Sequence, residues 1–261
     1  MKEKLGVFLF GQKLLRTLDL DPVYVMLHAS NLGQLQLRKW LVAYWCFYHC
    51  GTASWIADQP DFYKGMKEAA RSKAWPRGSE RRHFRGEQAL RSVESMREQF
   101  KNPNVLVQTL VSNKPQKLAE VVTKVKTLRG FGDWISFKVA DMLDRLGLSK
   151  VEFSADDIFS MFDSPKQGAQ LMFSMYNGSG EPSQWALQRI LAVLGSYKAP
   201  PMFERAINVQ EVETILCKWK SHMNGHYEVG KDIREIREAL ERFKLCKTSQ
   251  ALLRGMKKGG L

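Results

Sequence analysis

The densest group of residues able to do chemistry in this 261-residue chain is the segment WPRGSERRHFRG, residues 75–86, here called the arginine loop. It contains one acid, Glu80, and five bases: Arg77, Arg81, Arg82, His83 and Arg85. Guanidinium groups bind phosphate oxygens through paired hydrogen bonds, and several together suit a pyrophosphate or closely spaced phosphates. They would also stabilise charge on a departing phosphate group. A solvated loop that contacts DNA phosphates without sequence preference is the alternative interpretation.

Two further groups of residues are suited to proton transfer. Asp156 and Asp157 lie in the expected first turn of a helix capped by Ser154. His222 and His226 lie near three lysines within residues 217–231, and histidine is a base near neutral pH. Acids in a first helical turn commonly serve the helix alone, so catalytic and structural roles both stay open here.

The element that would position these groups centres on LRGFGDW, residues 128–134. Two amphipathic stretches that flank Leu-x-Gly-apolar-Gly are typical of a helix-hairpin-helix, expected at about 115–147. Glycines let the chain approach a phosphate closely, and the amides of the next helix favour an anion. The predicted DNA contacts are Gly130, Phe131, Gly132, Trp134 and Lys138. The second helix is expected to expose Trp134, Lys138, Asp141 and Arg145. An ordinary turn with a glycine cap is the alternative.

The rest of the chain predicts an all-α fold, because apolar residues recur at spacings of three and four almost throughout. We expect a single compact helical domain over residues 1–261, with two lobes and a cleft as one possible arrangement. A C-terminal helical pair is expected over about 208–245, and Gly225 is expected to end its first helix. The residues beyond this pair are expected to form a basic tail.

Composition restricts the partners and the compartment. The chain has 40 Lys and Arg against 27 Asp and Glu, a formal charge of +13, which favours a polyanion such as DNA. No apolar run is long enough to span a membrane, and four cysteines form no disulfide framework, so the cytoplasm is expected. Cys46, His49 and Cys50 permit a zinc site as a minority hypothesis, against ordinary buried thiols.

Four segments together carry a resemblance to a known family: residues 38–48 (RKWLVAYWCFY), the arginine loop, residues 137–142 (FKVADM) and residues 217–225 (CKWKSHMNG). They resemble the bacteriophage amino acid:DNA transferases of the alpha-glutamyl/putrescinyl thymine pyrophosphorylase group. That group is related to the helix-hairpin-helix DNA glycosylases. The resemblance spans about residues 25–245.

The resemblance implies a reaction on hypermodified thymine. A separate 5-hydroxymethyluracil DNA kinase pyrophosphorylates the base, and the transferase then displaces pyrophosphate with an amino acid or polyamine nitrogen, in the cytoplasm of the host cell. The arginine loop would hold the pyrophosphate, and Asp156, Asp157, His222 or His226 would accept the proton. Aromatic residues would receive an extruded base, with Trp40, Tyr44, Trp45, Tyr48 and Trp55 as candidates. No metal ligand is predicted, and two ions are left open, a divalent ion with pyrophosphate and a monovalent ion at the hairpin.

Two alternatives remain at this point. In the helix-hairpin-helix glycosylases an aspartate follows the hairpin by about twenty residues, and Asp156 and Asp157, 24 and 25 residues after Gly132, would take that place. A glycosylase would therefore share the fold, the binding of DNA and this aspartate, but would give the arginine loop no special task. Trp134 stands where strand-cleaving glycosylases carry a Schiff-base lysine, so such a lyase is disfavoured. A non-catalytic DNA-binding protein would need only the hairpin and the basic surface.

Overall fold

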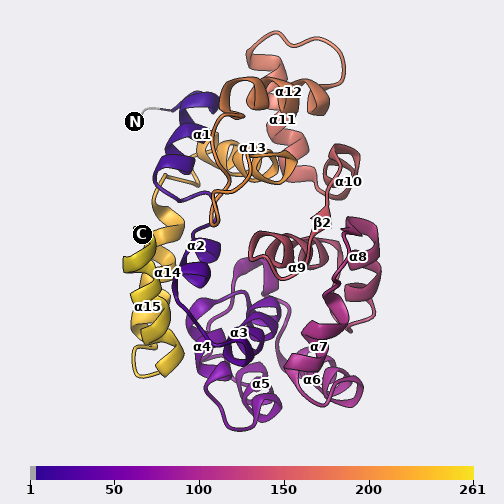
Figure 1. Ribbon diagram of the computed structural model, residues 1–261, viewed down its shortest axis with the longest axis vertical. Helices are drawn as coiled ribbons and strands as arrows, with labels where there is room; N and C mark the ends of the chain where they lie inside the picture. Colours follow the sequence, from indigo (N-terminus) through magenta and orange to yellow (C-terminus); the bar gives the residue numbers. More distant parts are fainter. Residues whose placement is uncertain (1–3) are drawn as a thin grey trace. The chain divides into compact units, whose positions relative to one another are not determined.

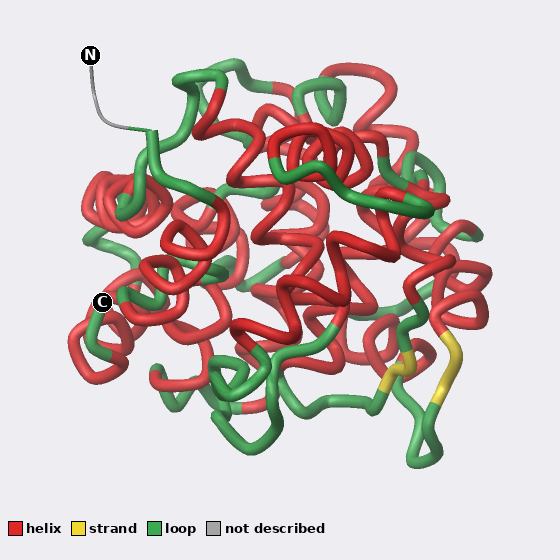
Figure 2. The backbone as a smooth tube through the Cα atoms, turned by 90° about the horizontal axis from the view of Figure 1, so that it is seen from above, coloured by secondary structure: helices red, strands yellow, loops and turns green. Residues whose placement is uncertain are grey.

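The computed structural model describes residues 4–261, and the described chain is almost entirely helical, which confirms the all-α prediction. Helices dominate the tube in Figure 2, and strands contribute two short pieces. The chain divides into two compact units, which are described separately. Unit 1 comprises the described part of Met1–Val25, with Glu152–Arg234 and Leu261, and unit 2 comprises Met26–Val151 and Glu235–Gly260. The predicted number of domains stays a prediction.

Unit 2 carries the arginine loop and the glycine-rich segment (Figure 1). Its elements are α3 (Gln34–Phe47), α4 (Cys50–Ala57), α5 (Phe62–Arg71), η1 (Ser79–Arg81), α6 (Gly86–Gln99), α7 (Pro103–Leu110), β1 (Gln116–Lys117), α8 (Leu118–Lys126), α9 (Asp133–Arg145) and α15 (Lys247–Gly259). The short strand β2 (Val151–Glu152) pairs with β1, and the division between the two units falls within β2. Helices α2 (Pro22–Ala29) and α14 (Lys231–Arg242) each belong in part to both units.

The second half of helix α3 is buried within unit 2, because it is apolar on nearly all sides. Every residue from Trp40 to Phe47 is buried, and α3 packs on α4 and α7. The helix ends at Phe47. Tyr48 takes a left-handed conformation with φ +49°, and the side chain of His49 accepts a hydrogen bond from the amide of Thr52 at the start of α4. A bulky residue rarely adopts such a φ, so the surrounding packing must impose it.

Unit 1 is built around α13, which packs against α1 and α11. Its elements are α1 (Val7–Arg16), α10 (Ala155–Met161), α11 (Asp163–Met175), α12 (Pro182–Leu194) and α13 (Val209–Met223). Asn208 and Glu211 form a capping box that fixes the start of α13. At the other end, Gly225 has φ +77° and follows the last turn, which confirms its predicted role as a helix end.

Two predictions about surfaces are wrong. Residues beyond 245 were expected to form a basic tail, but they form α15, because Leu252 and Met256 lie four residues apart and are both buried. Asp141 and Arg145 were expected on the exposed face of α9, but they are 1% and 4% exposed. Among the described helices, none combines the length and hydropathy needed to cross a lipid bilayer.

Candidate functional site

Arg77 closes the arginine loop upon itself. Its Nη2 donates hydrogen bonds to three main-chain carbonyl oxygens, those of Ala69 (3.3 Å), Ser72 (3.2 Å) and Trp75 (3.3 Å). Its Nη1 donates to the carbonyl oxygen of Phe84, and the guanidinium lies 5.6 Å from the centre of the Phe47 ring. Burial, and then the nearby charge of Arg85, lower the pKa of Arg77. Because its donors point at carbonyl groups, Arg77 shapes the loop.

Arg81 joins the arginine loop to the end of α3 and to the glycine-rich segment. Its Nε donates to the carbonyl oxygen of Cys46 at 3.0 Å, and its Nη1 donates to that of Gly130 at 2.9 Å. The guanidinium lies over the rings of Phe84 and Phe131, at 4.8 and 5.0 Å from their centres. The residue is 8% exposed, and burial lowers its pKa. Arg81 is therefore placed as an internal strut.

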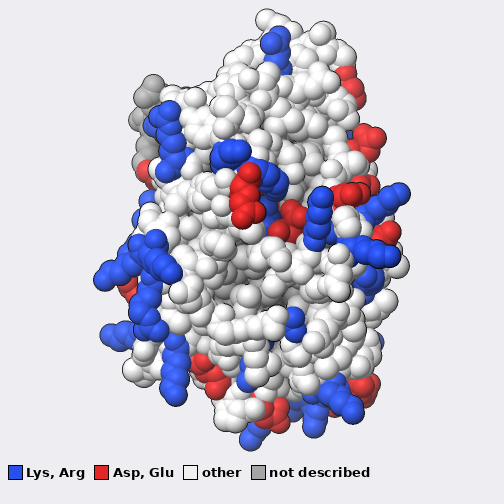
Figure 3. All heavy atoms as spheres, in the orientation of Figure 1, with Lys and Arg blue, Asp and Glu red and all other residues white. Residues whose placement is uncertain are grey.

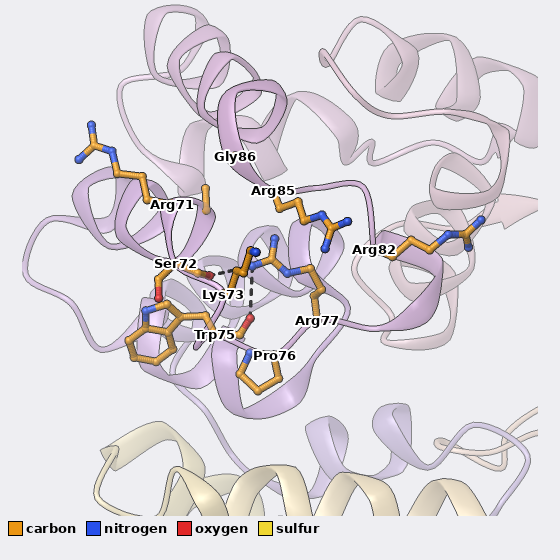
Figure 4. A pocket seen from close by; sticks show the side chains of 10 residues that line it. Arg71, Ser72, Lys73, Trp75, Pro76, Arg77, Arg82, Arg85 and Gly86 are labelled. Carbon is orange, nitrogen blue, oxygen red and sulfur yellow. Dashed lines mark hydrogen bonds between the residues drawn. The ribbon is translucent and has the colours of Figure 1, made fainter.

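The remaining arginines of the loop are exposed and line a pocket. The pocket has a volume of about 690 Å³ and five cationic lining residues: Arg71, Lys73, Arg77, Arg82 and Arg85. Trp75 and Pro76 add an apolar wall, and the described lining residues include no carboxylate (Figure 4). We call this the cationic pocket. His83 is exposed and does not line it. Such a concentration of positive charge suits a multiply charged anion.

Sequence reasoning missed Arg71 and Lys73. They lie at the end of α5 and just after it, and both line the pocket, although the Arg71 side chain extends away from the arginine loop in Figure 4. The available signal was their position: RSK, residues 71–73, stands directly before the loop in the sequence. They lie far from the hairpin in the sequence, and the sequence alone therefore did not indicate that they belong to the site.

The glycine-rich segment 127–132 forms a tight connection between α8 and α9, here called the hairpin. Gly130 has φ +82°, and a Cβ at this position would lie 2.9 Å from Oγ of Ser92. Gly132 has φ −98°, and a Cβ there would meet no atom within 4 Å. The carbonyl oxygen of Gly132 accepts hydrogen bonds from the amide (3.1 Å) and hydroxyl (2.8 Å) of Ser136. Gly130 is thus required by the fold, whereas the fold does not explain Gly132.

The other three predicted DNA contacts lie differently. Phe131 is 6% exposed and packs under Arg81, so its side chain belongs to the core. Lys138 is half-buried, with Nζ 3.9 Å from a carboxylate oxygen of Asp141. Trp134 is also half-buried and meets the ring of Tyr48 edge-on at 4.8 Å. At the hairpin, Gly130, Gly132, Trp134 and Lys138 are therefore accessible to a ligand at the surface, whereas the side chain of Phe131 is not.

Aromatic rings form a stack that begins in the core of unit 2 and ends at Trp134. Trp40 stacks on Tyr44 at 4.6 Å, and Tyr44 contacts Tyr48 at 4.7 Å. Burial, the largest cause, raises the pKa of Tyr44 well above its usual value. Trp40 and Trp45 are completely buried, so these two predicted pocket residues lie in the core. Tyr48 is half-buried at the outer end of the stack.

The fifth aromatic candidate, Trp55, lies near the cationic pocket. Its ring stacks on Trp75 at 3.9 Å, and Trp75 in turn stacks on Phe243 at 5.6 Å. Because Trp75 lines the pocket, this stack fixes one wall of it. Trp55 supports that wall from behind.

The two candidate aspartates lie in unit 1, in the first turn of α10. Ser154 caps this helix, as predicted, since its hydroxyl accepts a hydrogen bond from the amide of Asp157 at 3.1 Å. Asp156 is exposed and its Oδ1 accepts a hydrogen bond from Nε2 of Gln184 at 3.2 Å. Asp157 is half-buried. Because Ser154 provides the cap, the aspartate side chains are not needed for it.

The two candidate histidines, also in unit 1, differ in their surroundings. Nε2 of His222 accepts from the amide of Leu5 at 3.0 Å, its Nδ1 lies 3.0 Å from the carbonyl oxygen of Tyr227, and its ring stacks on Phe10. Both ring nitrogens are therefore engaged, which suits a structural role. His226 is exposed.

The lysines near these histidines serve other contacts. Lys218 donates to the carbonyl oxygen of Asp19 and pairs with Asp232 at 2.7 Å, and Lys220 donates to Gln167 at 2.8 Å. Asp19 is completely buried. Its carboxylate accepts from the hydroxyl of Tyr227 (2.7 Å) and from the amides of Gly230 (2.5 Å) and Ile233 (3.2 Å). Burial raises the pKa of Tyr227, with Asp232 and Asp19 adding to the shift. This network fixes the chain between α13 and α14.

The thiols considered for zinc are buried side chains of unit 2. Burial raises the pKa of Cys46 and of Cys50 to about 12, so both stay protonated. Nδ1 of His49 accepts from the amide of Thr52 at 3.0 Å. Within residues 4–261, no three His, Cys, Asp or Glu side chains gather as a metal site.

Charge on the face shown in Figure 3 is dispersed. Lysines and arginines form several small groups, some of them beside aspartates and glutamates, and much of the face carries neither sign. The net positive charge of the chain therefore does not form one continuous field on this face.

Comparisons with known proteins agree with this picture. A model of the amino acid:DNA transferase family matches residues 21–226. The chain is 39% identical to a glycinyltransferase of Pseudomonas phage PaMx11, with 97% of each chain covered. It is 26% identical to a putrescinyltransferase of Delftia phage PhiW-14, over 88% of this chain and 77% of that protein.

These matches confirm the predicted family resemblance and the predicted class of enzyme. The relation to helix-hairpin-helix DNA glycosylases stays a prediction. Since the family match covers most of the sequence, the chain belongs to the amino acid:DNA transferase family.

Proposed function

We propose that this enzyme transfers the amine of an amino acid or polyamine to the methylene carbon of 5-pyrophosphoryloxymethyluracil in duplex DNA and releases pyrophosphate. The observation that carries the proposal is the cationic pocket of this family member, whose described lining includes five positively charged residues and no carboxylate. A DNA glycosylase would have no use for such a pocket. A non-catalytic DNA-binding protein does not fit relatives that are named as transferases.

In this proposal the arginine loop stabilises the leaving group. Arg82 and Arg85 bind pyrophosphate oxygens directly, with His83 beside them, while Arg77 and Arg81 hold the loop in shape. Negative charge grows on the bridging oxygen as the C–O bond breaks. Fixed positive groups stabilise that charge without having to reorganise, so they lower the barrier.

The hairpin is proposed to bind the DNA backbone. Gly130 and Gly132 are exposed and bring main chain to the surface next to the N-terminus of α9, where a phosphate is favoured. Trp134 and Lys138 would add contacts to the same duplex. The half-buried Tyr48–Trp134 pair is proposed to stack on a thymine turned out of the duplex, as in other enzymes that act on an extruded base.

The proton acceptor is proposed among the aspartates of α10. A neutral amine attacks, so the donor ammonium must first lose a proton, and a carboxylate within reach would accept it. Asp156 and Asp157 stay the first candidates and His226 the next. We assign His222 a positioning role for Leu5 and Tyr227 because both of its ring nitrogens are engaged.

Two elements of the pathway lie outside the chain. An upstream 5-hydroxymethyluracil DNA kinase would supply the pyrophosphorylated base, and the reaction would take place in the cytoplasm of the infected host cell. The names of the relatives suggest glycine and putrescine as the first donors to test.

The proposal is tested by following pyrophosphate release from DNA that carries the activated base. Release should depend on an added amine, and Arg82→Gln with Arg85→Gln should lower kcat by about 100-fold. The exposed Arg97, on α6 and outside the pocket, provides the control variant Arg97→Gln. Equal losses in both proteins would remove the pocket from the mechanism.

A further inference from the structure

The positive charge of the cationic pocket disfavours the donor that the proposed reaction needs. At neutral pH an amino acid and a polyamine both carry their reactive nitrogen as an ammonium group. The described lining of the pocket includes five positively charged residues and no carboxylate, so its field repels that group. An acid close to the pocket is therefore needed to hold the donor nitrogen beside the methylene carbon.

Glu80 is the one acid of the arginine loop, and the neighbouring arginines do not neutralise it. Within the described chain, no Lys, Arg or His side chain lies within ion-pair distance of its carboxylate. The guanidinium groups of Arg77 and Arg81 are directed at main-chain carbonyl groups. Arg82 lines the pocket and donates to the carbonyl oxygen of Ser79 at 3.3 Å. Because Glu80 is exposed, its negative charge is accessible to a ligand.

The backbone of the loop places the Glu80 carboxylate close to Tyr48. Successive side chains of the 3-10 turn η1 point about 120° apart, so Arg81 enters the core while Glu80 lies at the surface. The amide of Gly78 donates to the carbonyl oxygen of Phe47 at 2.9 Å, which attaches the loop to the end of α3. A Cβ at Gly78 would lie 3.1 Å from Oε2 of Glu80 and 3.1 Å from Cβ of Tyr48. The missing side chain at this position thus leaves room for the carboxylate beside Tyr48.

This location adjoins both groups that the proposed function assigns to the substrate. Tyr48 and Trp134 form the pair proposed to stack on the extruded thymine, and Arg82, two residues after Glu80, is proposed to bind pyrophosphate. Since the reacting methylene joins the thymine ring to the pyrophosphate, it would lie close to Glu80. The charge of Glu80 also reaches the aromatic stack: burial raises the pKa of Tyr44 most, and the Glu80 carboxylate adds to the rise.

We propose that the carboxylate of Glu80 binds the ammonium group of the donor and holds its nitrogen beside the methylene carbon. This inference rests on the proposed function. The hydrogen bond from ammonium to carboxylate is charge-assisted, and it is the same whatever the rest of the donor carries. One proton passes from the ammonium group to the acceptor of the proposed function, and the nitrogen forms the C–N bond. The C–O bond breaks with its electron pair leaving on pyrophosphate, and Glu80 stays ionised throughout.

The test uses Glu80→Gln, which removes the charge and keeps the shape of the side chain. Full-length protein and activated DNA would be supplied with glycine or with putrescine. For each donor that the wild type uses, the KM should rise by about tenfold, while kcat at saturating donor and the KM for DNA change by less than about twofold. Glu98→Gln, an exposed position near the far end of α6, is the matched control and should change none of these. An unchanged donor KM in Glu80→Gln would overturn the inference.

Inhibition by free pyrophosphate separates the lost charge from damage to the loop. Removal of a negative charge beside the cationic pocket should leave the inhibition constant of pyrophosphate equal, or lower it by up to about threefold. A distorted loop would raise this constant. A higher value in Glu80→Gln would therefore assign Glu80 to the shape of the loop and overturn the inference. Absence of transfer from every amine in the wild type would instead refute the proposed function.

Discussion

Nη1 of Arg81 donates a 2.9 Å hydrogen bond to the carbonyl oxygen of Gly130, and this bond connects the arginine loop to the hairpin across 49 residues of sequence. The same guanidinium holds the carbonyl oxygen of Cys46 at the end of α3. Two elements with different proposed tasks, binding pyrophosphate and binding DNA backbone, thus share one buried strut. A displacement of either element would be transmitted to the other through Arg81.

Replacing Arg81 with Lys should impair both tasks together. Lysine has a point charge on a flexible stem and cannot hold two carbonyl groups with the fixed geometry of a guanidinium. We expect a loss of about 2 kcal/mol in unfolding free energy and weaker DNA binding together with a lower kcat. Urea unfolding, DNA titration and pyrophosphate release measure the three effects. As a control, Arg82→Lys, at an exposed position of the same loop, should leave the unfolding free energy unchanged. A stable Arg81→Lys protein with normal DNA affinity would show that Arg81 does not connect the two elements in this way.

The two glycines of the hairpin offer a matched pair of variants. Gly130→Ala should destabilise the fold by about 1–2 kcal/mol, because φ is +82° and the new Cβ would lie 2.9 Å from Oγ of Ser92. Gly132→Ala meets no atom within 4 Å and should leave the unfolding free energy nearly unchanged. If a phosphate approaches Gly132, its alanine variant should nevertheless weaken DNA binding. Unaltered DNA affinity in Gly132→Ala would remove this contact from the proposal.

The stability of unit 2 should decrease as the pH falls through the range in which histidine titrates. Burial, with the charge of Arg242 adding to it, lowers the pKa of His49 from 6.5 to about 4. Between these values the unfolded chain binds a proton that the folded chain does not. The contribution of neutral His49 to the free energy of unfolding is therefore complete above about pH 6.5. It is lost as the pH falls towards 4, by about 1–2 kcal/mol.

The matched variant for this pH dependence is His49→Asn. Asparagine can still accept the hydrogen bond from the amide of Thr52, but it does not titrate. Urea midpoints at pH 7, 6, 5 and 4.5 should fall more steeply for the wild type than for the variant. Parallel curves would show that His49 is not the group responsible.

The aspartates of α10 can be separated by single amide substitutions. One of Asp156→Asn and Asp157→Asn should lower kcat by about 100-fold with little change in KM, because the amide keeps the shape and loses the basicity. The helix start should persist in both, since Ser154 supplies its cap. Single-turnover measurements with saturating donor isolate the chemical step. Should neither variant lose activity, His226→Gln becomes the next variant to measure.

The sequence predicted the order and type of the helices well, because their apolar spacing and caps are local signals. The cap at Ser154 and the helix end at Gly225 are examples, each confirmed at its residue. The prediction of the exposed face of α9 was wrong because Asp141 and Arg145 are polar side chains that tertiary packing buries. The pattern of charges on one helix does not show which other elements cover it.

The site was harder to predict than the fold for a related reason. Arg77, Arg81, Arg82 and Arg85 are chemically equal in the sequence, and carbonyl groups from distant segments decide which of them are occupied. Aromatic spacing likewise could not separate Trp40, which is core, from Tyr48, which reaches the outer end of the stack. Arg71 and Lys73 entered the site through the return of the chain after α5.

The central claim is transfer of an amine to thymine with loss of pyrophosphate, and one measurement tests it most directly. Duplex DNA with 5-pyrophosphoryloxymethyluracil would be incubated with the purified protein and a mixture of amino acids and polyamines that includes glycine and putrescine, digested to nucleosides, and analysed by mass spectrometry beside an assay for free pyrophosphate. We expect an amine-linked thymidine and pyrophosphate in equal amounts. Unchanged activated nucleoside, or abasic sites in place of a linked product, would contradict the proposed reaction.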